Sequence, residues 1–207
     1  EDARGVAAAL GIPHYVLNYE AEFDREVIQY FTDAYLAGET PNPCVPCNSR
    51  LKFGSLLTRA RGWGAERVAT GHYARIQRDP GTGRYQLRRA VDSRKDQSYF
   101  LYILTQEQLA AARFPVGHLT KEETRRIAGE LGLGVAGKPD SQEICFAPGD
   151  YRSYLRQRVG DALVPGTIRD TGGAVRGRHP GVAFYTVGQR RGLGIGGHEP
   201  LYVIDLD

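Results

Sequence analysis

The sequence contains no methionine, one tryptophan and three cysteines among its 207 residues. Three cysteines are too few, and too odd in number, for the disulfide framework of a secreted domain, and in a cytosolic chain they indicate metal or redox chemistry. No apolar run approaches the roughly 20 residues of a membrane span, and the acidic, amphipathic start EDARGVAAAL does not resemble a signal peptide. We therefore expect a cytoplasmic protein with no membrane partner.

Because the sequence has no methionine, it also has no initiator methionine, and its first residues resemble the middle of an α/β pattern. We therefore expect it to be a fragment of a longer protein. With 41% hydrophobic and 25% charged residues it is typical of a globular chain that buries a core.

Charge is unevenly distributed along the chain, although the net charge is only +3. Residues 1–39 contain 8 acids and 2 bases, whereas residues 40–100 contain 12 bases and 4 acids, and two of the three cysteines lie in this basic part. Arginine supplies 23 of the 27 basic residues, and its planar fork suits phosphates and base edges. A nucleotide bias of the genome would also favour arginine over lysine, so composition leaves both explanations open.

Hydrophobic spacing predicts an α/β chain. We expect helices at residues 1–10, 21–36, 48–60, 97–112, 121–133 and 150–159, and strands at HYVLNY, ERVATGHYARI and RYQLRRA. Gly11 is expected to end the first helix, Thr120 and Glu123 to form a capping box at the start of the fifth, and the turn DPGTG, from Asp79, to join the last two strands. The prolines of residues 40–47 predict an irregular loop that holds the first two cysteines. After Pro165 the chain is glycine-rich with short β runs, GTIRD, GVAFYTVG and LYVIDLD. We therefore expect an open, mostly parallel sheet in a catalytic domain of residues 1–164 and a small β-rich domain of residues 165–207.

The pair Cys44 and Cys47 has the spacing Cys-x-x-Cys, which has several physical interpretations. A structural zinc site needs four ligands, and only Cys145 and five histidines remain to complete it. A redox pair at a helix N-terminus is equally compatible with the spacing. In a third interpretation the helix N-terminus, together with nearby Arg50 and Lys52, favours a nucleophilic thiolate at Cys47. Two half-buried structural cysteines remain a fourth interpretation.

Other candidate residues are ambiguous when taken singly. Cys145, between two apolar residues, is by itself more typical of a core cysteine. Gly71 and His72 follow an apolar stretch at the expected carboxyl end of a strand, where α/β sheets bind ligands, although a structural histidine is equally common there. SRKDQSYF suits phosphate and base contacts, but it also suits a solvated helix start.

Six segments together resemble one family. TPNPCVPCN, ATGHYAR, KDQSYFLY, FPVGHLTKEETRRIA, DSQEICF and YTVGQRRGLGIGG occur in this order and strongly resemble the tRNA-specific 2-thiouridylases. The resemblance extends over essentially the whole chain and implies an adenine nucleotide alpha hydrolase-like nucleotide-binding domain. It implies ATP-dependent replacement of O2 of the wobble uridine of tRNA by sulfur.

The resemblance assigns roles to the cysteines. Cys47 matches the catalytic nucleophile, and Cys145 matches the cysteine that carries the persulfide sulfur. Asn42, Pro43 and Cys44 match the stretch that interacts with the target base, where many members have Asp in place of Cys44.

Binding roles follow from the same resemblance. Gly71 matches an ATP contact and His72 a tRNA contact. Lys95, Asp96 and Gln97 match a further tRNA-binding stretch, and the glycine-rich GQRRGLGI belongs to a small central domain that also faces tRNA.

The implied co-substrate is ATP with Mg²⁺, with no bound metal cluster, and the implied partners are the tRNA anticodon loop and a sulfur-donor protein, either a cysteine desulfurase or a sulfur relay. The family's phosphate-binding loop, of the type Ser-Gly-Gly-Val-Asp-Ser, and most of its C-terminal β-barrel do not occur in the sequence, so we expect this chain alone to be inactive. Two other functions remain as alternatives: a zinc-stabilised RNA-binding module that uses Cys44, Cys47, Cys145 and His72, and a cytosolic thiol-disulfide oxidoreductase.

Overall fold

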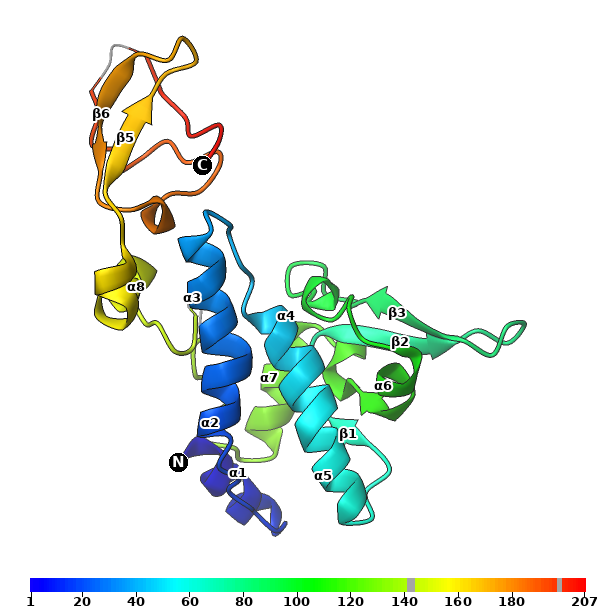
Figure 1. Cartoon of the computed structure of the whole chain (residues 1–207). Helices are drawn as coiled ribbons and strands as arrows, with labels where there is room; N and C mark the ends of the chain where they lie inside the picture. Colours follow the sequence, from blue (N-terminus) through cyan, green and yellow to red (C-terminus); the bar gives the residue numbers. More distant parts are fainter. Residues whose placement is uncertain (141–143, 197–198) are drawn as a thin grey trace. The chain divides into compact units, whose positions relative to one another are not determined.

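The computed structural model describes residues 1–140, 144–196 and 199–207. Contacts divide the chain into two compact units (Figure 1). The first unit comprises Glu1–Glu26 and Cys44–Asp140, and the second comprises Val27–Pro43 and Ser141–Asp207.

Helices are the main regular structure of the first unit. In chain order its helical segments are α1 (Asp2–Leu10), α2 (Glu20–Phe23), α4 (Cys44–Pro46), the π-helix η2 (Cys47–Ser55), α5 (Leu56–Gly62), the 3-10 helix η3 (Ser98–Phe100), α6 (Gln106–Ala111), the 3-10 helix η4 (Pro115–His118) and α7 (Lys121–Glu130). A π-helical turn, η1 (Asp24–Ile28), continues α2 across the boundary between the units into α3 (Gln29–Leu36).

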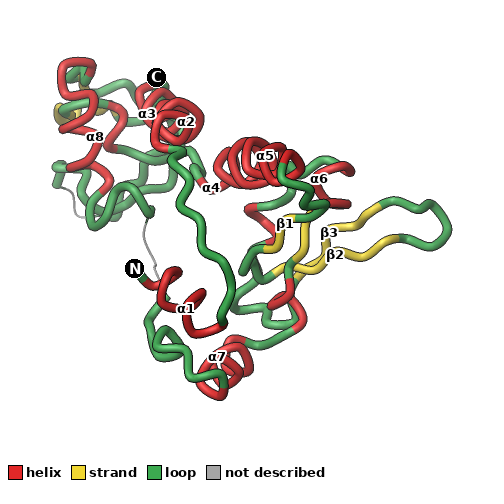
Figure 2. Tube along the Cα trace, turned by 90° about the horizontal axis from the view of Figure 1, so that it is seen from below, coloured by secondary structure: helices red, strands yellow, loops and turns green. Residues whose placement is uncertain are grey.

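Strands of the first unit form two small sheets. β1 (Val68–Ala69) pairs in parallel with β4 (Ala112–Arg113). β2 (Ala74–Arg78) and β3 (Tyr85–Arg89) form an antiparallel hairpin that projects from the unit (Figures 1 and 2). Helices together with a parallel strand pair agree with the predicted α/β class.

A hydrophobic core joins η2, α6 and the strands of both sheets. Phe53 from η2, Ala74 from β2 and Leu109 from α6 are buried together in a cluster that also contains Leu101, Leu104, Ala112 and Phe114. The helix that carries the first two cysteines is therefore fixed to both sheets by a buried aromatic ring.

Helix ends in this unit follow the sequence signals. Gly11 ends α1 in the left-handed conformation, with φ 65°. Thr120 and Glu123 form the predicted capping box of α7: the Glu123 amide donates to Thr120 Oγ1 (3.1 Å) and the Thr120 amide donates to Glu123 Oε2 (2.7 Å). A second capping box, formed by Thr105 and Gln108 at α6, was not predicted.

The second unit has a separate aromatic core. Its elements are α3, α8 (Tyr151–Val159), the 3-10 helix η5 (Gly160–Ala162), β5 (Gly166–Arg169), β6 (Val175–His179) and the 3-10 helix η6 (Val182–Phe184), and β5 pairs antiparallel with β6. Phe31 and Tyr35 of α3 pack with Leu155 of α8 and Phe184 of η6. The predicted start of the second domain, after residue 164, lies between η5 and β5 and stays a prediction.

Several predicted elements are wrong in detail. HYVLNY is not a strand: Tyr15 and Val16 are 77% and 75% exposed, and no described segment offers this stretch a ladder of hydrogen bonds. ERVATGHYARI is two strands, β1 and β2, interrupted at residues 70–73, and the expected helix of residues 97–112 is reduced to η3 and α6. GVAFYTVG contains the 3-10 helix η6 in place of a strand, and LYVIDLD contains no strand. Both predictions failed because β propensity alone supplies no pairing partner.

Candidate functional site

Cys44 and Cys47 lie in the first two turns of one helix, which α4, η2 and α5 form end to end. The predicted loop over residues 40–47 is therefore wrong from residue 44 onward. Pro46 is compatible with the helix because a proline in the first turn interrupts no helical hydrogen bond. Cys44 is an exposed residue, and Cys47 is intermediate in exposure.

Cys47 begins the π-helix η2, a geometry that occurs as short segments inside α-helices, frequently at functional sites. Gln108 supports this turn from α6: its Nε2 donates to Ser49 O (2.9 Å) and to Phe53 O (3.0 Å). A Cβ on Gly54 would lie 3.0 Å from Ser49 O, so the widened turn requires a small residue there. The backbone that carries Cys47 is thus held by a side chain that the sequence did not point to, although Gln108 occupies the recognisable third position of a capping box.

Asn48, the neighbour of Cys47, is 1% exposed and anchors the same helix. Its Nδ2 donates to Phe100 O (3.1 Å) in the segment that follows the KDQ motif. Its Oδ1 is buried and has no hydrogen-bond partner within the described residues.

Arg50 and Lys52, expected to favour a thiolate at Cys47, have other interactions in the structure. Arg50 Nη1 lies 3.2 Å from Glu26 Oε2, and this ion pair offsets part of its charge. The positive charge of Lys52 acts on His72.

His72 is buried between two phenylalanines rather than displayed to solvent. It is 9% exposed, and its ring centroid lies 6.4 Å from that of Phe53 and 5.7 Å from that of Phe114. Its Nδ1 is 2.6 Å from Thr70 Oγ1. Burial, with a smaller contribution from Lys52, lowers the pKa of His72 to about 4, so the imidazole is neutral at neutral pH. Its predicted contact with tRNA stays a prediction.

We expect His72 to make the chain sensitive to mild acid. Between pH 6.5 and about 4 the unfolded chain takes up a proton at this histidine and the folded chain does not, so stability falls as pH falls through this window. The two pKa values imply a loss of roughly 2–3 kcal/mol in the free energy of unfolding. Chemical denaturation at pH 7 and pH 4.5 measures this loss. The free energy of unfolding of H72Q should depend less on pH than that of the parent. Equal pH dependence of the two proteins would contradict the prediction.

Gly71 lies just beyond β1 at the carboxyl end of the parallel pair, the edge at which α/β sheets bind ligands. It is exposed, and no heavy atom lies within 4 Å of the place that a Cβ would take. Its backbone is therefore accessible to a ligand, and its contact with ATP stays a prediction.

Asp96 and Gln97 make hydrogen bonds within the chain. Asp96 Oδ1 accepts from the Ala90 amide (2.8 Å) and Oδ2 from Ser98 Oγ (2.6 Å). Gln97 Oε1 accepts from the Tyr73 amide (2.9 Å), and the Gln97 amide donates to Tyr73 O (2.8 Å). These bonds fix the KDQ segment to the start of β2, directly after His72.

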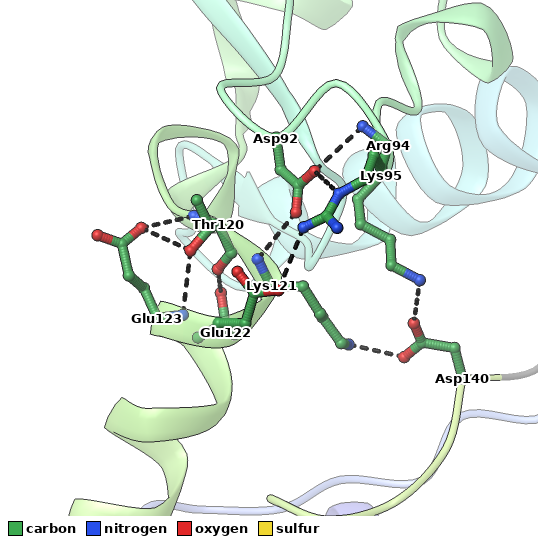
Figure 3. A network of polar contacts seen from close by, with 9 residues as sticks. Asp92, Arg94, Lys95, Thr120, Lys121, Glu122, Glu123 and Asp140 are labelled. Carbon is green, nitrogen blue, oxygen red and sulfur yellow. Dashed lines mark hydrogen bonds and ion pairs between the residues drawn. The ribbon is translucent and has the colours of Figure 1, made fainter.

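Lys95 takes part in a charged network with the start of α7 (Figure 3). Asp140 accepts from both lysines, with Oδ2 2.7 Å from Lys95 Nζ and Oδ1 2.7 Å from Lys121 Nζ. Buried Asp92 accepts from the Lys121 amide (3.1 Å) and the Arg94 amide (3.1 Å). Hydrogen bonds to Lys121 and Lys95 lower the pKa of Asp140 to about 2, so the carboxylate stays ionised in mild acid.

We expect D140N to destabilise the first unit by about 1 kcal/mol, because two ammonium groups lose a shared carboxylate. E122Q is a matched control: it removes one carboxylate of an ion pair with Arg94 (3.1 Å) whose two side chains are 74% and 76% exposed, and we expect almost no change. Urea unfolding at neutral pH measures both. Equal effects of the two substitutions would contradict the role of Asp140.

Cys145 belongs to the second unit and is an exposed residue with a free thiol, so it is not a core cysteine. Its neighbours are the buried anchors: Ile144 and Phe146 pack against the aromatic core, and the Phe146 ring lies 5.1 Å from that of Phe31. The apolar flanks that suggested burial of the cysteine therefore pack against the core, while Cys145 itself is exposed. Residues 141–143 of the same motif lie outside the described residues.

The glycine-rich segment GQRRGLGI forms a turn in the second unit. Gly188, Gly192 and Gly194 have φ values of 86°, 73° and 70°, which favour glycine. Gln189 closes the turn, accepting from the Thr186 amide (3.1 Å) and donating to Arg191 O (2.9 Å). Its contact with tRNA stays a prediction.

Within the described residues no cluster of three or more His, Cys, Asp or Glu side chains is arranged to hold a metal ion. In the same residues no helix is both long and apolar enough to cross a membrane.

Comparison with known proteins identifies the family. Residues 1–149 match the family model described as tRNA methyl transferase HUP domain. The chain belongs to this family. Residues 152–207 match a second model, the tRNA methyl transferase PRC-barrel domain, in agreement with the predicted α/β domain followed by a small β-rich domain.

Relatives across the whole chain are named tRNA-specific 2-thiouridylase MnmA. Those of Heliobacterium modesticaldum, Moorella thermoacetica and Methylobacterium radiotolerans are 56%, 55% and 56% identical over 100% of this chain and over 54%, 58% and 54% of their own length. The resemblance to the 2-thiouridylases is thereby confirmed. The chain spans a little over half the length of these relatives.

Proposed function

We propose that this chain provides the sulfur-transfer residues of an enzyme that replaces O2 of the wobble uridine of tRNA by sulfur. The observation that carries the proposal is the chain-wide identity of 51–56% to proteins named tRNA-specific 2-thiouridylase, combined with a cysteine thiol at each of the two predicted positions. Relatives so named act on tRNA by their name, and the arginine-rich part of this chain suits a polyanion.

A carbonyl oxygen is a poor leaving group, and ATP supplies the activation by making uridine O2 depart as AMP. The HUP family model supports ATP use, and the accessible backbone of Gly71 at the strand edge would contact ATP. Mg²⁺ as the partner of the phosphates stays a prediction.

Cys145 holds the sulfur as a persulfide, received from a sulfur-donor protein. The Cys47 thiolate attacks Sγ of Cys145, the S–S bond of the persulfide breaks, and its electron pair leaves with the terminal sulfur. The released sulfide then forms the new bond to C2 as AMP departs. In the alternative order the terminal sulfur attacks C2 while it is still bound to Sγ of Cys145, AMP departs, and the Cys47 thiolate attacks Sγ afterwards. Both routes end in a Cys47–Cys145 disulfide, with an S–S bond of about 2 Å, which two electrons from a dithiol reduce.

The residues around Cys47 orient the nucleophile. Gln108 holds the carbonyls of the π-helical turn, and Asn48 ties the same turn to the segment after the KDQ motif. Asn42, Pro43 and Cys44 would meet the extruded wobble base, because a base must leave its stack for chemistry at C2.

Complementation tests the function. The complete gene that encodes this chain, placed in a bacterial strain without its own 2-thiouridylase, should restore 2-thiouridine to tRNA, measured by mass spectrometry of nucleosides. A methylated uridine in place of 2-thiouridine, or no modified uridine at all, would refute the proposal.

A further inference from the structure

The β2–β3 hairpin has an excess of positive charge that no acidic side chain of the described residues offsets by an ion pair. Between Ala74 and Arg89 it contains five arginines and a single acid, Asp79. The five are Arg75, Arg78, Arg84, Arg88 and Arg89. We propose that this hairpin is an RNA-binding surface that contacts the phosphate backbone of the tRNA outside the reaction site, an inference that rests on the proposed function.

The one acid of the hairpin is committed to the turn. Asp79 Oδ1 accepts from the Gly81 amide (3.0 Å) and the Thr82 amide (2.7 Å), and Oδ2 accepts from Gln86 Nε2 (3.0 Å). Hydrogen bonds from Thr82 lower the pKa of Asp79, so its carboxylate is ionised while it accepts the hydrogen bonds of the turn. It forms no ion pair with an arginine in the described part of the chain.

None of the five arginines has an acidic partner within 4.0 Å among the residues that the structure describes. Their hydrogen bonds to other residues leave most guanidinium N–H groups available. Arg75 Nε donates to Arg89 O (2.8 Å), Arg78 Nε to Gly83 O (3.1 Å) and Arg88 Nη2 to Gln86 Oε1 (2.8 Å). Each arginine can therefore still offer donors to a phosphate.

The register gives the hairpin a polar outer face. Arg75 pairs with Arg88 and Gln77 with Gln86 across the two strands, while Ile76 and Leu87 pair on the opposite face and pack against the core. Like charges directly opposite each other cost stability in a hairpin, and the fold itself does not require the Arg75–Arg88 pair. Two adjacent phosphates would relieve the repulsion.

RNA fits this face better than an acidic protein surface does. Guanidinium forks bind phosphate oxygens in pairs, and the two glutamines add neutral donors for ribose or base edges. The hairpin projects from the unit (Figures 1 and 2), and its five-residue strands extend about 17 Å, which allows contact with several nucleotides.

Binding of an unmodified tRNA transcript to the full-length protein from the complete gene tests the proposal. R75Q/R88Q should raise the dissociation constant about tenfold and lower the slope of log K against log [salt] by 1 to 2, as expected for two lost phosphate contacts. The control R4Q/R125Q removes the same charge from exposed positions on α1 and α7 and should change the dissociation constant less than twofold. Because the repulsion is removed, R75Q/R88Q should melt at the same temperature as the parent or higher.

Equal dissociation constants and equal salt slopes for the two double variants would overturn the proposal. Weakened binding of poly-glutamate with unchanged binding of tRNA would also overturn it and would assign the surface to an acidic protein. This readout is independent of thiolation: weakened tRNA binding supports the surface even if no 2-thiouridine is formed, and thiolation with unchanged binding refutes the surface alone.

Discussion

We expect C47S and C145S, each introduced into the complete gene, to abolish 2-thiouridine formation. A serine at position 145 cannot hold a persulfide, and a serine at position 47 is protonated at neutral pH and cannot displace sulfur from one. Affinity for tRNA should stay within a few-fold of the parent, because phosphate contacts dominate binding. Nucleoside mass spectrometry and a tRNA binding isotherm measure the two effects.

Cys44 supplies the matched control. It is an exposed residue in the first turn of the same helix, and C44D should keep most activity because the proposed chemistry uses Cys47 and Cys145. Mild oxidation followed by peptide mass spectrometry should show a Cys47–Cys145 link. Normal thiolation by either serine variant, or a dominant Cys44–Cys47 link, would show that the roles are wrongly assigned, and the second result would favour the thiol-disulfide oxidoreductase.

The largest effect on stability is expected from G117A. A Cβ at Gly117 would overlap the carbonyl oxygen of Ala74 and lie 2.6 Å from its carbonyl carbon, so backbone atoms would have to move. Ala74 is completely buried at the start of β2, and the Val91 amide donates to Gly117 O (3.1 Å), so both sides of the contact are fixed. We expect a loss of about 3 kcal/mol in the free energy of unfolding and a melting temperature roughly 10 °C lower.

The control for this substitution is G129A. Gly129 lies within α7, and no heavy atom is within 4 Å of the place that its Cβ would take, so alanine should stabilise the helix by up to about 1 kcal/mol. Thermal unfolding followed by circular dichroism compares the two variants. A melting temperature of G117A equal to that of the parent would show that the contact with Ala74 is not tight.

Local signals predicted the local elements. Gly11 ended α1, Thr120 and Glu123 capped α7, and the Asp79 turn joined the arms of the hairpin, because each depends on residues within a few positions. HYVLNY failed as a strand because a strand needs a partner that propensity cannot supply. The loop expected up to Cys47 failed because prolines are tolerated in the first helical turn.

The candidate site also has features that local sequence predicted and features that depend on distant residues. The residue types and their order identified the family and named the three candidate cysteines, since covalent chemistry depends on which atoms are present. His72 and Cys145 could not be placed from sequence: the first is enclosed by Phe53 and Phe114, and the second is exposed although its neighbours are anchored in a core. The burial of a residue depends on contacts with segments that are distant in the sequence, so neighbouring residues do not predict it.

By itself the sequence determined the chemistry that this chain can carry, namely the thiols, the arginine-rich stretch and the family that both indicate. Only the tertiary structure decided which groups are accessible and which are held. Gln108 holds the π-helical turn from a distance of more than fifty residues along the chain, Asp140 binds Lys95, and the hairpin arginines are left without acidic partners in the described residues. The physical reason is that pairing and burial depend on separations in space, which residues far apart in the sequence set together.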